Sequence, residues 1–139
     1  MNNFSNKHNA GIKPNPLIKE KIIDNAVDNK LPCAIAFKIA KELGVSASEI
    51  GKNADLINFR LTKCQLGLFG YTPEKKIIKP QDTVDDEIKT TIKTAVVDNK
   101  LTCENAWQIA ATYNVHKLAV SAACEFMGIK ITKCQLGAF

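Results

Sequence analysis

The sequence lacks a long apolar run, and this absence excludes one class of protein. None of its 139 residues lies in an uninterrupted apolar stretch of about 18, the length that spans a bilayer. Residues 1–16 also lack the apolar core of a secretory signal. We therefore expect a soluble cytoplasmic protein with no membrane partner.

Catalytic motifs are missing as well. The chain has only two histidines, His8 and His116. It contains no phosphate-binding glycine loop, no G-x-S-x-G nucleophile elbow and no H-E-x-x-H metal motif. No set of cysteine, histidine and acid recurs along the chain either, so we expect no enzyme activity.

Charge is present but unevenly distributed. The formal net charge is +5; residues 1–80 carry 13 basic and 7 acidic residues, whereas residues 81–139 carry 6 and 7. A basic first half indicates that this part of the molecule meets a polyanion. At this modest charge, the alternative that lysine only keeps the protein soluble stays open.

The sequence repeats itself once. Val27–Phe69 and Val97–Phe139 align without a gap, and 17 positions are identical, including VDNKL at the start and TKCQLG near the end. This pattern indicates a tandem duplication. A unit of about 50 residues buries little apolar surface by itself. We therefore expect the two copies to pack on each other with approximate two-fold symmetry.

The repeat divides the chain into four parts. Residues 1–16 are polar, end in two prolines and are predicted to form a flexible N-terminal arm. The first repeat covers residues 17–69, and residues 70–81, which contain two more prolines, are predicted to be a linker. The second repeat covers residues 82–139. Each repeat is predicted to hold three helices and one strand, which makes the fold mainly α.

Helical periodicity predicts the three helices of the first repeat. Residues 17–29 carry apolar side chains at helical spacing, and the second helix begins near Pro32 and stops at Gly44. The third helix follows a capping box that starts at Ser46 and runs to about residue 57.

The second repeat offers equivalent signals. Asp82 and Thr102 suit helix N-caps, and Asn114 replaces the turn glycine as a residue that tolerates a left-handed backbone. Alternating side chains predict one wing-like strand in each copy, within Asn58–Leu66 and Gly128–Leu136. We expect these two strands to pair with each other at a shared seam, because each then satisfies the other's edge.

Residues 36–55 resemble the helix-turn-helix of bacterial transcription regulators. The resemblance rests on a small residue at Ala40, a glycine at Gly44 in the expected turn, and an aliphatic residue at Ile50. The preceding helix and the following strand make each copy similar to a reduced winged-helix domain. The resemblance therefore implies a tandem helix-turn-helix protein that binds double-stranded DNA and regulates transcription.

The resemblance also implies which residues meet DNA. In such regulators the second helix of the motif enters the major groove, and its outward residues read bases. The outward positions here are Ser46, Ala47, Ser48, Gly51, Lys52 and Asp55. Expected contacts are Ser46, Ser48, Lys52 and the nearby Asn53, with Arg60 and Lys63 on the strand binding phosphates.

The second copy is expected to be a degenerate version. Its third helix is apolar nearly all round, which is typical of a buried helix or of a homodimer interface. His116, Lys117 and Ser121 remain as secondary DNA contacts.

Two other functions stay open. A helix-turn-helix scaffold also serves as a protein-interaction module. Alternatively, the matching cysteines converge on zinc or an iron–sulfur cluster and form a metal or redox sensor. The candidate ligands are Cys33, Cys64, Cys103 and Cys134. No C-x-x-C motif is present and free cysteine usually packs as a small buried hydrophobe, so no cofactor is predicted.

Overall fold

The computed structural model of the chain describes residues 4–82 and 84–139. The described part is mainly helical, as the sequence predicts, and it also contains small strand pairs. The chain divides into two compact units. Unit 1 runs to Cys64 and also includes Leu136–Ala138, and unit 2 comprises Gln65–Gln135 and Phe139.

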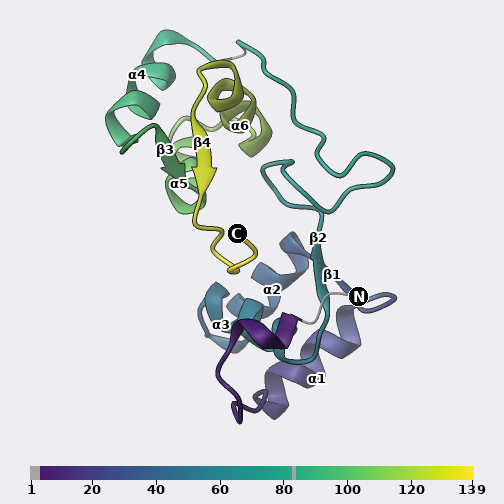
Figure 1. Ribbon diagram of the computed structural model, residues 1–139. Coiled ribbons are helices and arrows are strands. Elements are labelled where there is room, and N and C mark those ends of the chain that lie inside the picture. The colour runs from purple at the N-terminus through teal and green to yellow at the C-terminus, as the bar shows by residue number, and fades with distance from the viewer. Residues whose placement is uncertain (1–3, 83) are drawn as a thin grey trace. The chain divides into compact units, whose positions relative to one another are not determined.

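The two units share one order of elements (Figure 1). In unit 1 this order is α1 (Pro16–Asn25), β1 (Lys30–Pro32), α2 (Cys33–Leu43), α3 (Ala47–Leu56) and β2 (Arg60–Thr62), preceded by the short 3-10 helix η1 (Phe4–Lys7). In unit 2 it is α4 (Asp86–Ala95), β3 (Lys100–Thr102), α5 (Cys103–Thr112), α6 (Lys117–Phe126) and β4 (Lys130–Thr132). Each of these elements of unit 2 begins at the residue that aligns with the start of its counterpart in unit 1.

The strands pair inside each unit. β1 lies parallel to β2, from Lys30 opposite Arg60 to Pro32 opposite Thr62, and β3 lies parallel to β4 in the equivalent register. The predicted pairing between the two copies is therefore wrong, because each strand already has a partner in its own unit. The partner strand comes before α2 in the chain, so the pair is not a wing that follows the third helix.

A tight turn leads into β1. Helix α1 ends at Asn25, earlier than predicted, and Asp28 and Asn29 follow with φ of 54° and 59°. The backbones of Val27 and Lys30 exchange hydrogen bonds of 3.1 and 3.0 Å across this turn. Two consecutive positive φ angles suit Asp and Asn in a type I′ turn. The VDNKL sequence is thus used as a turn and a strand in each copy, not as the end of a helix.

Left-handed backbone positions also recur at equivalent places in the two units. Lys63 and Gly67, both within the first TKCQLG, have φ of 49° and 73°, and their counterparts Lys133 and Gly137 have φ of 53° and 80°. The doubled hexapeptide therefore has a local structural role. The other recurring left-handed positions are Asp28 and Asp98, Asn29 and Asn99, Gly44 and Asn114, and Asn58 and Gly128.

The leucine of each hexapeptide is buried. Leu136 is 1% exposed and belongs to unit 1, and Leu66 is 0% exposed and belongs to unit 2. A Cβ atom at Gly51 in α3 would lie 1.7 Å from the Leu136 carbonyl oxygen. Position 51 therefore needs glycine, because the backbone at Leu136 lies directly against the helix.

The helix caps agree with most of the sequence signals. The Ser46 hydroxyl accepts a hydrogen bond from the Glu49 backbone N–H, and the Thr102 hydroxyl accepts one from Asn105, so both N-cap predictions are confirmed. The prediction for Asp82 is wrong, because Asp85 caps α4 by accepting a bond of 3.0 Å from the Ile88 N–H.

Candidate nucleic-acid interface

The first turn of α3 is the exposed part of the predicted reading helix. Gly44 takes a left-handed φ of 65° at the end of α2, and Ser46 then caps α3. Ser46 and Ser48 are exposed, and their hydroxyl oxygens lie 3.0 Å apart. Lys52 is half-buried one turn further on. Glu49 is also exposed here and adds a negative charge.

The DNA contact predicted at Asn53 and the outward positions predicted at Gly51 and Asp55 are wrong, because these three residues are buried. Gly51, Asn53 and Asp55 all lie inside unit 1. Asn53 is 3% exposed; its Oδ1 accepts a 2.7 Å hydrogen bond from the Asn15 backbone N–H. Its Nδ2 donates a 2.8 Å bond to the Glu49 carbonyl oxygen. Asn53 therefore fixes the segment before α1 on α3 and is not available to a base.

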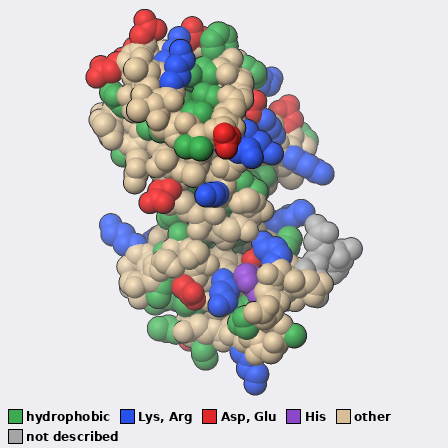
Figure 2. Space-filling model, turned by 60° about the vertical axis from the view of Figure 1, so that its left-hand side comes forward, with side chains coloured by type: hydrophobic (Ala, Val, Ile, Leu, Met, Phe, Trp, Pro, Cys, Tyr) green, Lys and Arg blue, Asp and Glu red, His purple; other side chains and the backbone are tan. Residues whose placement is uncertain are grey.

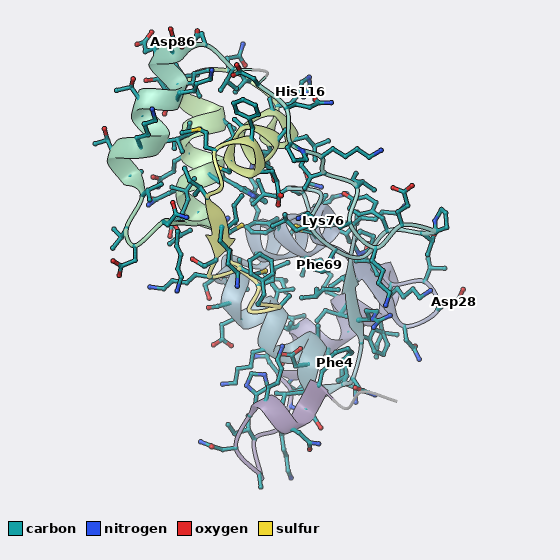
Figure 3. All side chains as sticks on the ribbon, turned by 45° about the horizontal axis from the view of Figure 1, so that its top comes forward. Phe4, Asp28, Phe69, Lys76, Asp86 and His116 are labelled. Atoms are coloured by element: carbon teal, nitrogen blue, oxygen red, sulfur yellow. The ribbon has the colours of Figure 1, made fainter. Side chains whose placement is uncertain are left out.

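The segment before α1 covers the C-terminal half of α3. Asp55, 4% exposed, has one carboxylate oxygen 3.1 Å from Lys7 Nζ and 2.9 Å from His8 Nε2. The Phe4 backbone N–H donates a 2.9 Å bond to Asn58 Oδ1, and Figure 3 shows where Phe4 lies in η1. Residues predicted to form a free arm thus make specific contacts, although Met1–Asn3 lie outside the described residues. Among the described residues of α3, the exposed ones are Ser48 and Glu49 in the first turn, and Lys52 in the next turn is half-buried.

The two strand residues of the predicted interface are accessible. Arg60 and Lys63 are both exposed. Among the described residues, the lysines that form ion pairs are Lys7, Lys21, Lys76 and Lys89. Arg60 and Lys63 are therefore not neutralised by an acidic side chain in this part of the chain.

The secondary contacts predicted in unit 2 have different surroundings. His116 is exposed at the N-cap of α6, and Lys117 holds its Nζ 4.6 Å from the centre of the Trp107 ring. Ser121 is 0% exposed, so the predicted DNA contact at Ser121 is wrong. Five of the ten residues of α6 are buried, from Val120 to Cys124. The apolar Leu118 and Phe126 are exposed, so the burial predicted from the apolar sequence of this helix holds only in part.

The predicted linker packs on unit 2. Lys76 Nζ lies 2.5 Å from Glu125 Oε1, and the Gln81 backbone N–H donates a 3.2 Å bond to the Ala122 carbonyl oxygen. Residues before the first helix therefore cover the third helix in unit 2 as they do in unit 1. Glu125 aligns with Asp55 in the repeat, so the acidic partner of the covering lysine also recurs.

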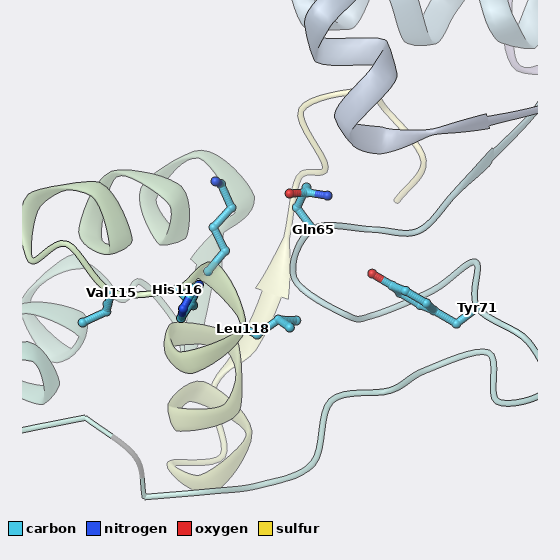
Figure 4. Close-up of a pocket in the computed structure, with 6 residues that line it drawn as sticks. Gln65, Tyr71, Val115, His116 and Leu118 are labelled. Carbon is cyan, nitrogen blue, oxygen red and sulfur yellow. The ribbon is translucent and has the colours of Figure 1, made fainter. Parts of the chain in front are cut away.

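A hollow of about 300 Å³ opens beside the start of α6 (Figure 4). Tyr71 extends into it from the loop before α4, and its hydroxyl end points towards the space between Gln65 and Leu118. His116, Lys117 and Val115 complete the lining. Two of the predicted secondary contacts, His116 and Lys117, therefore share one hollow.

The cysteines do not gather into a metal site within the described residues. Those residues contain no group of three or more cysteine, histidine or acidic side chains suited to a metal ion. None of the five cysteines, all of which lie in the described part of the chain, forms a disulfide bond, and all but Cys134 are buried. Burial, with a smaller effect of the Glu125 charge, raises the pKa of the Cys124 thiol to about 11. The zinc or iron–sulfur hypothesis gains no support from this arrangement.

Basic side chains do not form one large patch on the face of the molecule shown in Figure 2. On the face shown in Figure 2, Lys and Arg side chains are spread over the surface, with acidic groups between some of them. Lys89 is an example of a lysine that is paired with an acidic side chain, and its hydrogen bond to Asp82 raises the pKa of its ammonium group. Any polyanion contact therefore has to be assigned to particular basic residues.

The comparisons with known proteins identify no relative. No protein-family model matches the chain, and no curated protein or solved structure matches it either. None of the described helices combines the length and apolar character needed to cross a membrane. The candidate interface is thus defined by its own residues and geometry.

Proposed function

We propose that the protein binds double-stranded DNA as a transcriptional regulator and docks through the first turn of α3 in unit 1. One observation carries this proposal: α2, the left-handed Gly44 and α3 form two helices joined by a tight turn, and the first turn of the second helix is capped and exposed. In helix-turn-helix proteins, the N-terminal residues of the second helix contact base edges in the major groove.

The exposed Ser48 and the half-buried Lys52 of α3 suit this role. The Ser48 hydroxyl both donates and accepts hydrogen bonds, and Lys52 donates to base acceptors or phosphates. Ser46 keeps the helix N-terminus in shape, and the free N–H groups there favour a phosphate. Arg60 and Lys63 supply phosphate contacts that hold the protein in place without reading sequence.

The proposal treats unit 2 as a degenerate copy in a duplicated protein. The matching element starts and left-handed positions support a common origin of the two units. Burial of Ser121 and the apolar character of α6 support a packing role for its third helix. Approximate two-fold packing, a homodimer through unit 2 and a cytoplasmic location stay predictions. No catalytic activity or cofactor is part of the proposal.

Selection from a library of random duplexes tests the proposal. The reduced protein should enrich a defined sequence, because groove docking reads bases. A Lys52→Ala variant should bind the enriched duplex about tenfold more weakly, because a good base contact contributes about 1–3 kcal/mol. Lys41→Ala is the matched control: Lys41 is an exposed lysine on α2, and its loss changes the charge equally.

Three results separate the alternatives. Enrichment with selective weakening by Lys52→Ala supports docking through α3. Equal weakening by both variants would show that charge alone drives binding, and groove docking would then be wrong. Absence of any duplex binding at low salt would contradict DNA binding altogether and favour the protein-interaction alternative.

A further inference from the structure

Within Val27–Phe69 and its copy Val97–Phe139, five charged positions carry the same sign in both copies. The aligned pairs are Asp28 and Asp98, Lys30 and Lys100, Asp55 and Glu125, Arg60 and Lys130, and Lys63 and Lys133. The lysines on the second and third helices are lost instead: Gln108, Ala111 and Ala122 stand where the first copy has Lys38, Lys41 and Lys52. The retained charges therefore need a reason that applies to both units.

Folding accounts for the two acidic positions. Asp28 and Asp98 occupy left-handed turn positions with φ of 54° and 51°, which Asp tolerates better than most residues. Asp55 and Glu125 pair with Lys7 and Lys76, which fix the segment before each unit's first helix.

Folding does not account for the paired basic residues on the strands. Lys30 lies directly opposite Arg60, and Lys100 lies directly opposite Lys130. Neighbouring strands are about 4.8 Å apart, so each pair places two positive side chains close together. Like charges directly opposite each other destabilise a strand pair. All four side chains are exposed, and none forms an ion pair within the described residues.

The third retained basic position is also unfavourable for folding alone. Lys63 and Lys133 are exposed at the ends of β2 and β4 with φ of 49° and 53°. Glycine or asparagine tolerates this backbone better than lysine does. The lysine in both copies therefore points to a role outside the folded chain.

We propose that each unit binds the phosphate backbone of DNA through the basic surface of its strand pair. The unit 1 surface consists of Lys30, Arg60 and Lys63, and the unit 2 surface consists of Lys100, Lys130 and Lys133. Unit 2 thus binds DNA although Ser121 and half of the residues of its third helix are buried, and one chain has two points of attachment. The choice of DNA as the polyanion rests on the proposed function. The presence of two equivalent basic surfaces does not depend on that function.

Triple alanine variants of each surface test this inference. Fluorescence anisotropy with a mixed-sequence duplex at several salt concentrations gives the slope of log K against log salt, which counts phosphate contacts. Each triple variant should lower the magnitude of that slope by about two to three, roughly one per lost contact. The control is Lys38→Ala, Lys41→Ala, Lys93→Ala, which removes three exposed charges from helices and should change the slope by less than about one.

The triple variant of the unit 2 surface tests most directly whether unit 2 contacts DNA phosphates. If it binds with the slope of the unaltered protein, the inference is wrong, even where Lys52→Ala still weakens binding. If both surface variants lower the slope but selection enriches no sequence, the phosphate contacts of the two basic surfaces are supported. The proposal that α3 reads bases in the major groove is then wrong. Binding to vesicles rich in phosphatidylserine, with none to the duplex, would overturn the assignment to DNA. Circular dichroism spectra should match across all variants, because no buried group is altered.

Discussion

Replacement of Gly51 by alanine gives a sharp test of how the hexapeptide leucine is held in unit 1. In the interior of an exposed helix, alanine is more favourable than glycine by about 1 kcal/mol. Helix propensity alone therefore predicts a more stable protein. In α3, however, the new Cβ would lie 1.7 Å from the Leu136 carbonyl oxygen, and that atom belongs to the backbone.

Either response to this clash lowers the free energy of unfolding. If the segment stays in place, overpacking costs about 1–3 kcal/mol. If the segment moves away, the burial of the Leu136 side chain is lost, which costs about 1.5–3 kcal/mol. A Cβ 1.7 Å from a backbone atom forces a shift, which places the cost of overpacking in the upper part of its range. After the gain in helix propensity is subtracted, we expect Gly51→Ala to lower the stability by about 0.5–2 kcal/mol.

Urea unfolding followed by circular dichroism measures this change, provided that the dependence on urea stays the same. The matched control is Ser121→Ala, at the equivalent position of unit 2. Position 121 already carries a Cβ, and the buried Ser121 hydroxyl has no hydrogen-bond partner among the residues that the structure describes. Its removal should leave stability unchanged or raise it by about 1 kcal/mol. A Gly51→Ala protein as stable as the original would refute the close contact with Leu136.

Three further predictions concern single side chains. Lys30→Glu places a negative charge opposite Arg60 on the neighbouring strand, so it should raise the free energy of unfolding by a few tenths of a kcal/mol. The same change should weaken duplex binding. A lower stability in thermal melts would contradict the register of Lys30 with Arg60. Asp55→Asn removes the carboxylate that holds the covering segment, so trypsin should cleave after Lys7 several-fold faster, and an unchanged rate would argue against this contact. Burial raises the pKa of the Cys124 thiol from 9.0 to about 11, which lowers its thiolate fraction about a hundredfold at pH 8. Iodoacetamide should therefore label Cys124 far more slowly in the folded protein than in urea. Comparable labelling rates, measured by mass spectrometry, would contradict the burial of Cys124.

The helices and several of their ends were predictable because they depend on local signals, although the end of α1 and the N-cap of α4 were predicted wrongly. The turn at Gly44, the caps at Ser46 and Thr102, and the left-handed Asn114 all follow from residue type and spacing. The apolar pattern of α6 predicted the burial of Val120–Cys124, but not the exposure of Leu118 and Phe126. These features involve residues a few positions apart, which is the range over which sequence patterns are informative.

Pairing and covering contacts were not predictable in the same way. β1 has only three residues, too few to show an alternating pattern, although Asp28 and Asn29 carry the composition of a type I′ turn. The contact of His8 with Asp55 joins residues 47 positions apart. No periodic signal marks such a contact, so Asp55 was assigned to an open helix face.

The most direct test of the central claim is fluorescence anisotropy of the reduced protein with mixed-sequence duplex DNA over a range of salt concentrations. DNA binding through basic side chains predicts association at low salt that weakens steeply and linearly on a log–log scale as salt rises. A protein that shows no association with duplex DNA at low salt would contradict both the docking of α3 and the phosphate contacts of the strand pairs.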